Sequence, residues 1–130
     1  MTLQQTGVRP EIIIRATDED RLTELANGLL DHQPDLAETL LAELGRARIV
    51  AAEAVPRDTV QMGSTFRYSA DGRERRVTLV YPADADIDAG RVSVGTPIGA
   101  ALLGLAEGQT IDWTARNGAS HELTIIAVER

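Results

Sequence analysis

The 130-residue sequence contains no cysteine, no lysine and few aromatic residues. Without cysteine, disulfides and thiolate metal ligands are excluded, and a reducing cytoplasm is the expected location. No run approaches the roughly 20 apolar residues that span a bilayer, and the N-terminus lacks an apolar signal segment. One Phe, one Trp and two Tyr leave Leu, Ile, Val and Ala to form the core.

All 13 basic residues are arginines, and 20 acidic residues give a formal net charge of −7. Phosphate neutralisation supplies most non-specific affinity for nucleic acids, so we expect no strong direct nucleic-acid binding. The densest basic run contains Arg73, Arg75 and Arg76 on a predicted strand. Two interpretations stay open for this run: a solvated strand edge that resists aggregation, or a contact patch for an acidic partner surface.

The sequence motifs of common catalytic and metal sites are missing. His32 and His121 are the available near-neutral bases, and neither lies in a recognisable nucleophile motif. Glycine-rich nucleotide-binding loops are absent. The acidic run at 84–88 resembles the start of a calcium loop, but Ala89 and Gly95 occupy the positions that require Gly and Glu. We therefore expect no enzymatic activity, no metal, no cofactor and no small-molecule substrate.

Two amphipathic helices are predicted in the N-terminal third, after a strand or extended segment at 11–15. Thr17 is the predicted N-cap of the first helix. Pro34 suits the first turn of the second helix, which we expect to reach Glu53. The short break between them predicts an antiparallel hairpin of coiled-coil type. The expected seam of the second helix comprises Ala37, Leu40, Leu44, Ala47 and Ala51.

Strand patterns dominate the remainder of the sequence. We expect strands at 65–68, 73–81, 91–94, 110–114 and 122–128, the last two joined across Asn117 and Gly118. Thr96 is predicted to cap a short helix that begins at Pro97. The order of elements predicts an α+β fold. Its expected parts are a flexible tail (1–10), a short N-terminal helical hairpin (11–55) and an antiparallel β domain with one short helix (56–130).

The stretch from Val92 to Gly104, followed by Glu107 and Gly108, resembles the strand–S/T-P–helix segment of the C-terminal domain of the Gre transcript-cleavage factors. A strand that ends in Tyr-Pro before the acidic loop at 84–88 agrees with that family, as does the preceding two-helix segment. Within this superfamily the sequence is most similar to the regulators of nucleoside diphosphate kinase. The resemblance covers nearly the whole chain and rests on the ordered set of features.

The resemblance implies an FKBP-like C-terminal domain that binds the rim of the secondary channel of bacterial RNA polymerase, with the hairpin pointing into the channel. The family's contact loop corresponds to Gly95, Thr96, Pro97 and Ile98. Thr96 and Pro97 are equally explained as an N-cap and a first-turn proline, and both roles are compatible. Gly95 stands where cleavage factors can carry an acidic residue.

The predicted hairpin tip contains Asp31, His32 and Asp35. Cleavage factors resemble one another in a longer coiled coil with paired acidic residues, which help to hold a catalytic magnesium ion in the polymerase. Because the two aspartates here are not adjacent, we expect a non-catalytic regulator that binds core RNA polymerase and competes with Gre factors, as a monomer or weak dimer. The alternatives are a Gre-like stimulator of transcript cleavage or elongation, and a direct protein regulator of a nucleoside diphosphate kinase.

Overall fold

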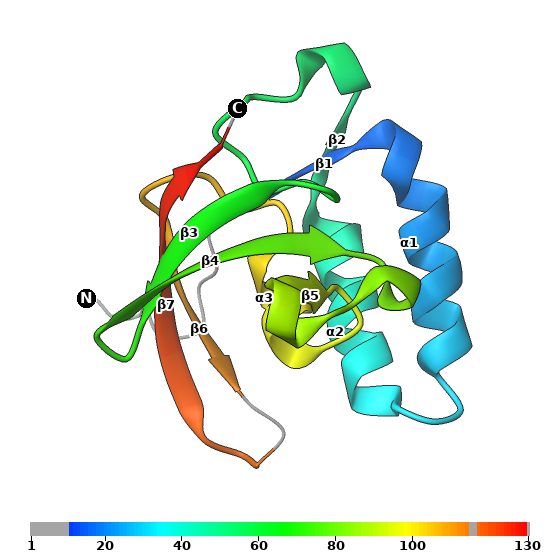
Figure 1. Cartoon of the computed structure of the whole chain (residues 1–130). Coiled ribbons are helices and arrows are strands. Elements are labelled where there is room, and N and C mark those ends of the chain that lie inside the picture. Colours follow the sequence, from blue (N-terminus) through cyan, green and yellow to red (C-terminus); the bar gives the residue numbers. More distant parts are fainter. Residues whose placement is uncertain (1–10, 115–116, 130) are drawn as a thin grey trace, which may run out of the picture.

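The computed structural model describes residues 11–114 and 117–129 (Figure 1), so the predicted flexible tail lies outside the described residues. Two helices cover one side of a five-stranded sheet, and a third short helix lies between them and the sheet. The helices and strands are β1 (Ile13–Arg15), α1 (Ala16–Leu29), α2 (Pro34–Arg46), β2 (Arg48–Val50), β3 (Thr65–Ala70), β4 (Arg73–Val80), β5 (Arg91–Ser93), α3 (Pro97–Leu102), β6 (Thr110–Thr114) and β7 (Ser120–Val128).

The first helix begins directly after a strand, and this changes its cap. Arg15, the last residue of β1, is the N-cap residue of α1 and makes no side-chain capping bond. The predicted cap at Thr17 is therefore wrong, because this residue already lies in the first helical turn. The backbone N–H of Arg15 instead donates to Oε1 of Gln61 at 3.0 Å. The helix thus starts where β1 ends.

The second helix starts at Pro34 as predicted but ends at Arg46, which makes it about 20 Å long. The predicted continuation to Glu53 is wrong, and Ala47 and Ala51 do not belong to a helical seam. The residues from Arg48 to Val50 form β2 instead, which pairs in parallel with β1. The β-branched residues of this segment favour an extended backbone, and a partner strand distant in sequence is available.

The main sheet has the strand order β5-β4-β3-β7-β6. Three of its pairings are antiparallel, but β4 and β5 pair in parallel, so the predicted antiparallel domain is a mixed sheet. Strand β6 has its predicted bounds, and β7 begins two residues earlier than expected. Of the turn between them, Asn117 and Gly118 are described, and Gly118 has a φ of +85°.

A single hydrophobic core joins the helices to the sheet. Leu22 of α1 and Leu40 of α2 are fully buried in the same cluster as Phe66 of the sheet. Ile12 and Ile14 are also fully buried, and the backbone of Gly104 lies against Ile12 and Ile13. The helical segment is therefore fixed to the sheet through β1. Among the described residues, none of the helices is long and apolar enough to cross a membrane.

Candidate functional site

The loop between β5 and α3 is held by hydrogen bonds that its own residues make. The Thr96 hydroxyl donates to the carbonyl of Ser93 at 2.6 Å and accepts from the N–H of Gly99 at 3.1 Å. The Ser93 hydroxyl accepts from the N–H of Gly95 at 2.9 Å. The capping role predicted for Thr96 is confirmed, and Pro97 occupies the first turn of the helix. These bonds leave the loop few alternative conformations.

The same loop is also held by a close approach between the backbones of Gly99 and Ser93. A Cβ atom added to Gly99 would lie 2.0 Å from the carbonyl oxygen of Ser93, a distance that real Cβ atoms do not reach. Only glycine therefore lets α3 begin so close to the end of β5. The four residues of the predicted contact loop, Gly95, Thr96, Pro97 and Ile98, are each partly exposed. The loop thus presents a fixed surface to solvent.

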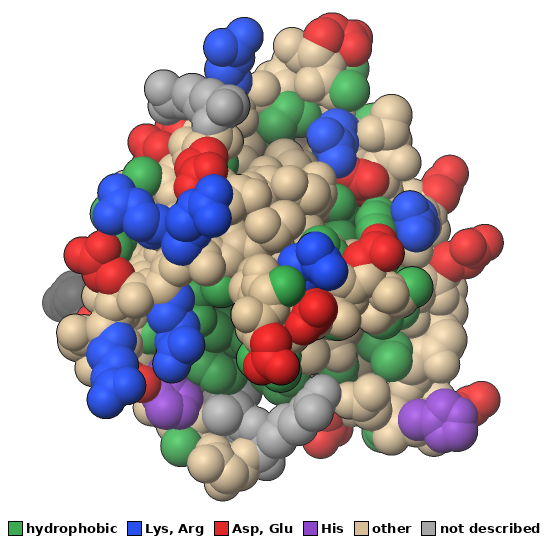
Figure 2. Space-filling view, viewed as in Figure 1, with side chains coloured by type: hydrophobic (Ala, Val, Ile, Leu, Met, Phe, Trp, Pro, Cys, Tyr) green, Lys and Arg blue, Asp and Glu red, His purple; other side chains and the backbone are tan. Residues whose placement is uncertain are grey.

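A groove of about 680 Å³ runs beside this loop, with Thr96 and Ile98 in its wall. Tyr68 and Val77 of the sheet line its inner side, and the turn at Ile87–Ala89 lines its outer side. In Figure 2 a hollow with hydrophobic side chains lies between a group of basic side chains and a group of acidic ones. The groove is therefore apolar inside and charged at its edges.

The predicted basic run lies at the exposed end of β4 and is divided between the two faces of the sheet. Arg75 and Arg76 both line the groove, whereas Arg73 does not. Arg76 forms an ion pair with Glu129, with Nη2 and Oε1 3.0 Å apart. This exposed pairing raises the pKa of Arg76 and lowers that of Glu129. The structure thus brings two of the three predicted arginines together with the predicted contact loop.

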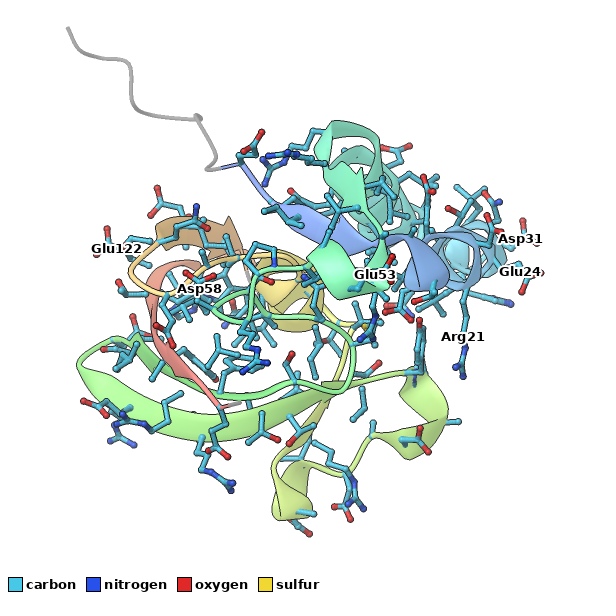
Figure 3. All side chains as sticks on the ribbon, turned by 90° about the horizontal axis from the view of Figure 1, so that it is seen from above. Arg21, Glu24, Asp31, Glu53, Asp58 and Glu122 are labelled. Carbon is cyan, nitrogen blue, oxygen red and sulfur yellow. The ribbon has the colours of Figure 1, made fainter. Side chains whose placement is uncertain are left out.

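The residues of the predicted hairpin tip do not line this groove. Asp31, His32 and Asp35 are all exposed, and among the described residues their side chains form no hydrogen bond or ion pair. Figure 3 shows Asp31 on the outer side of the helices, with its side chain pointing away from the sheet. The described residues contain no cluster of three or more potential metal ligands, here or elsewhere.

The acidic segment before β5 folds into two short 3₁₀ turns, Pro82–Asp84 and Ile87–Ala89. The side chain of Asp86 accepts from the backbone N–H of Ala89 at 3.3 Å and lies 3.7 Å from Arg91. Gly90 closes the segment with a φ of +76°, a conformation that glycine adopts without strain. The aspartate thus shapes the outer wall of the groove.

Sequence reasoning missed a polar cluster that ties α1 to the end of β4. The Tyr81 hydroxyl donates to Asp18 at 3.1 Å, and the guanidinium of Arg21 lies 3.7 Å from the centre of the Tyr81 ring. Arg15 donates to the same carboxylate at 2.7 Å and to the carbonyl of Met62 at 3.1 Å. Burial, with the neighbouring carboxylate, raises the pKa of Tyr81 to about 12.

No local sequence pattern predicts this cluster, because Tyr81 and Asp18 are 63 residues apart. From the sequence alone, Asp18 is expected only to stabilise the N-terminus of a helix, and Tyr81 is expected only to continue one face of a strand. The cluster links α1 to the residue that follows β4.

Comparison with known proteins places the chain in a family. The family model described as "Transcription elongation factor, GreA/GreB, C-term" matches residues 55–130, which is more than half of the chain. The chain belongs to the GreA/GreB family. A second family model, described as "Rnk N-terminus", matches residues 10–50 of this GreA/GreB-family protein.

Individual relatives agree with this assignment. The "Regulator of nucleoside diphosphate kinase" of Escherichia coli K12 is 39% identical over 123 residues, which cover 93% of this chain and 90% of that protein. The "Transcription elongation factor GreA" of Rhodospirillum rubrum is 34% identical over 84 residues, which cover 62% of this chain and 54% of that factor. These relatives are named as a regulator and a transcription factor. The predicted resemblance to the regulators of nucleoside diphosphate kinase is confirmed.

A solved structure gives the same result in three dimensions. The "Prokaryotic transcription elongation factor GreA/GreB from Nitrosomonas europaea" superimposes with a TM-score of 0.74 at 37% identity, and covers 94% of this chain and all of that one. The arrangement of two helices and a five-stranded sheet is therefore that of a GreA/GreB-family protein.

Proposed function

We propose that this GreA/GreB-family protein binds core RNA polymerase near its secondary channel through Gly95, Thr96, Pro97 and Ile98, and regulates transcription without catalysing a reaction. In this proposal it competes with Gre factors for one docking position. The names of its relatives, a regulator and several transcription elongation factors, support the polymerase as the partner.

The observation that carries the proposal is the rigidity of the loop. Thr96 is hydrogen-bonded to both Ser93 and Gly99, and the ring of Pro97 fixes its own backbone torsion φ. A loop that is already ordered loses little conformational entropy when a partner docks, so more of the contact energy appears as affinity. Loops on a rigid scaffold are also where binding residues are most often found.

The hairpin tip supports a regulator over a cleavage stimulator. Asp31 and Asp35 are separated by three residues and by the start of α2, so they do not form the adjacent acidic pair of the cleavage factors. The helices are 14 and 13 residues long, which gives each about 20 Å of reach. We therefore propose that adding the protein to backtracked polymerase leaves RNA cleavage unchanged, and a clear rise in cleavage would contradict this part.

The test of docking is a binding titration with purified core RNA polymerase. We expect wild type to bind with a Kd at or below about 1 μM, roughly −8 kcal/mol. The double variant Thr96→Ala/Pro97→Ala should bind at least tenfold more weakly, whereas Thr96→Ser, which keeps the hydroxyl, should bind like wild type. Circular dichroism of all three proteins controls for unfolding. Absence of binding by wild type would refute the proposal.

The name of the E. coli relative raises the question of the kinase. We propose that an effect on a nucleoside diphosphate kinase passes through transcription, because in our proposal the contact loop binds the polymerase. Kinase activity measured with purified enzyme should then be the same with and without this protein. A direct change in that activity would favour the alternative function.

A further inference from the structure

We infer that the groove beside Thr96 and Ile98 is a docking site for a protein segment that carries a carboxylate next to an apolar side chain. The inference deepens the proposed function, on which it rests for the choice of RNA polymerase as the partner to test. Its chemistry, however, follows from the groove itself. At one end lies an arginine that has no carboxylate partner among the described residues, and at the rim lies an exposed apolar side chain.

The cation is Arg75. Of the three arginines that line the groove, Arg76 is paired with Glu129 and Arg91 lies near Asp86. Among the described residues Arg75 has no carboxylate partner. It is paired with Tyr68 on the neighbouring strand β3. Burial raises the pKa of the Tyr68 hydroxyl, and the charge of Arg75 partly opposes this rise.

A guanidinium at the edge of an apolar surface is well suited to bind a carboxylate, because it offers several donors in a fixed plane. The chain as a whole carries a net charge of −7, so carboxylates are plentiful, yet Arg75 has no carboxylate partner among the described residues. It selects for an acidic group on the partner and against a basic one at that end.

The apolar half of the site is centred on Ile87. This side chain is 88% exposed, and the 3₁₀ turn Ile87–Ala89 holds it at the rim of the groove. Ile98 and Val92 are only partly buried on the opposite side. When a partner covers an exposed branched apolar side chain, apolar surface is removed from water, which favours binding.

The charges give the site a direction. Asp88 lines the groove next to Ile87, whereas Arg75 lies at the end formed by β4. The carboxylate of the segment should therefore lie toward β4, and its apolar side chain should lie between Tyr68, Ile87 and Ile98. A groove of about 680 Å³ is within the size range of sites that hold a few residues or a small ligand.

The first test compares two charge reversals on one strand. Arg75→Glu changes the groove, and Arg73→Glu makes the same change two residues earlier, on the same face but outside the groove. Both positions are exposed, so both variants should fold. We expect binding to core RNA polymerase to weaken at least tenfold for Arg75→Glu and less than twofold for Arg73→Glu.

A second pair tests the apolar half. Ile87→Ser removes the exposed side chain at the rim, and Leu30→Ser removes another exposed apolar side chain, 42% exposed, at the hairpin tip. We expect a loss of about fivefold for the first and none for the second. Equal behaviour within each pair, with intact binding by wild type, would overturn the groove site and leave the proposed function standing.

A third measurement does not depend on the polymerase. The ¹⁵N-labelled full chain is titrated with the peptide acetyl-Leu-Asp-Leu-Glu-amide and with its Asn/Gln counterpart. We expect amide shifts around Arg75, Ile87 and Ile98 with the acidic peptide only. If these shifts occur but wild type does not bind polymerase, the proposed partner is wrong and the groove chemistry holds. If neither peptide shifts the groove, the inference is refuted.

Discussion

In the loop after β5, the side chains of Ser93 and Thr96 are hydrogen-bonded within the loop, and Gly99 is packed against a carbonyl oxygen. At the hairpin tip, by contrast, Asp31 and His32 are exposed and, among the described residues, bond to nothing through their side chains. Both regions were candidate contact sites in the sequence. The comparison shows that hydrogen bonds order the side chains of the loop after β5, whereas the side chains of Asp31 and His32 at the tip have no such bonds among the described residues.

This difference has a consequence for substitutions. A change in the loop disturbs an internal network, so stability and binding should fall together. A change at Asp31 or His32 removes no side-chain contact within the described residues, so it reports mainly on the partner. The predictions that follow use this contrast, from the largest expected effect to the smallest.

A glycine pair gives the strongest contrast. Gly99→Ala forces the new Cβ into the carbonyl of Ser93, so the free energy of unfolding should fall by about 3 kcal/mol. Gly45→Ala, in α2 with open space around it, should raise the free energy of unfolding by about 1 kcal/mol. Urea unfolding followed by circular dichroism measures both. A harmless Gly99→Ala would show that the loop is not held as described.

The cap of α3 should contribute less. Thr96→Ala removes the hydroxyl that bonds to Ser93 and Gly99, and we expect a loss of about 1–2 kcal/mol in the free energy of unfolding. Thr96→Ser keeps both bonds and serves as the control. If alanine and serine are equally stable in thermal melts, the hydroxyl has no structural role.

The Tyr81 cluster extends the comparison to the base of the helices. Tyr81→Phe removes the hydrogen bond to Asp18 but keeps the ring beneath Arg21, so we expect a loss of about 1 kcal/mol at neutral pH. The pKa of Tyr81 is raised from 10.0 to about 12. Its stabilising contribution is therefore complete below pH 10 and is lost as the pH rises toward 12.

Unfolding free energies measured at pH 8, 10 and 11.5 check this dependence. Between the last two values, wild type should lose more stability than Tyr81→Phe, because the variant has no hydroxyl to ionise at this position. Tyr68 is present in both proteins and cancels in the difference. Parallel pH profiles for the two proteins would contradict a coupled Tyr81–Asp18 pair.

The smallest effects belong to the hairpin tip. Asp31→Asn should change the free energy of unfolding by less than about 0.5 kcal/mol, because this exposed carboxylate has no side-chain partner among the described residues. Asp35→Asn removes a charge from the first turn of α2 and should cost about 0.5 kcal/mol. Neither change should alter RNA cleavage by backtracked polymerase. A loss of cleavage activity in either variant would restore the cleavage-stimulator alternative.

The sequence predicted those parts of the fold that depend on interactions between neighbouring residues. Thr96 and Pro97 mark the start of α3 because a cap and a first-turn proline act within one helical turn. The strand expected at 110–114 likewise has the bounds of β6. The candidate contact loop could therefore be located, since its residue types and its order in the chain are visible in the sequence.

Pairings between distant segments could not be predicted in the same way. The end of α2 at Arg46 depends on β2 finding β1, more than 30 residues earlier in the chain. The groove depends on Arg75, Ile87 and Ile98 meeting from separate elements, and the Tyr81 cluster on a contact across 63 residues. Helical periodicity continued through 47–51 in the sequence, but strand pairing prevailed there.

The most direct test of the central claim is a competition experiment on core RNA polymerase. Labelled wild-type protein is bound to the polymerase, and an unlabelled Gre cleavage factor is then titrated in. If the loop from Gly95 to Ile98 docks at the shared position, the label should be displaced, and Thr96→Ala/Pro97→Ala should displace it far less well than unlabelled wild type. Simultaneous binding of both factors, or no binding of the labelled protein, would contradict this account.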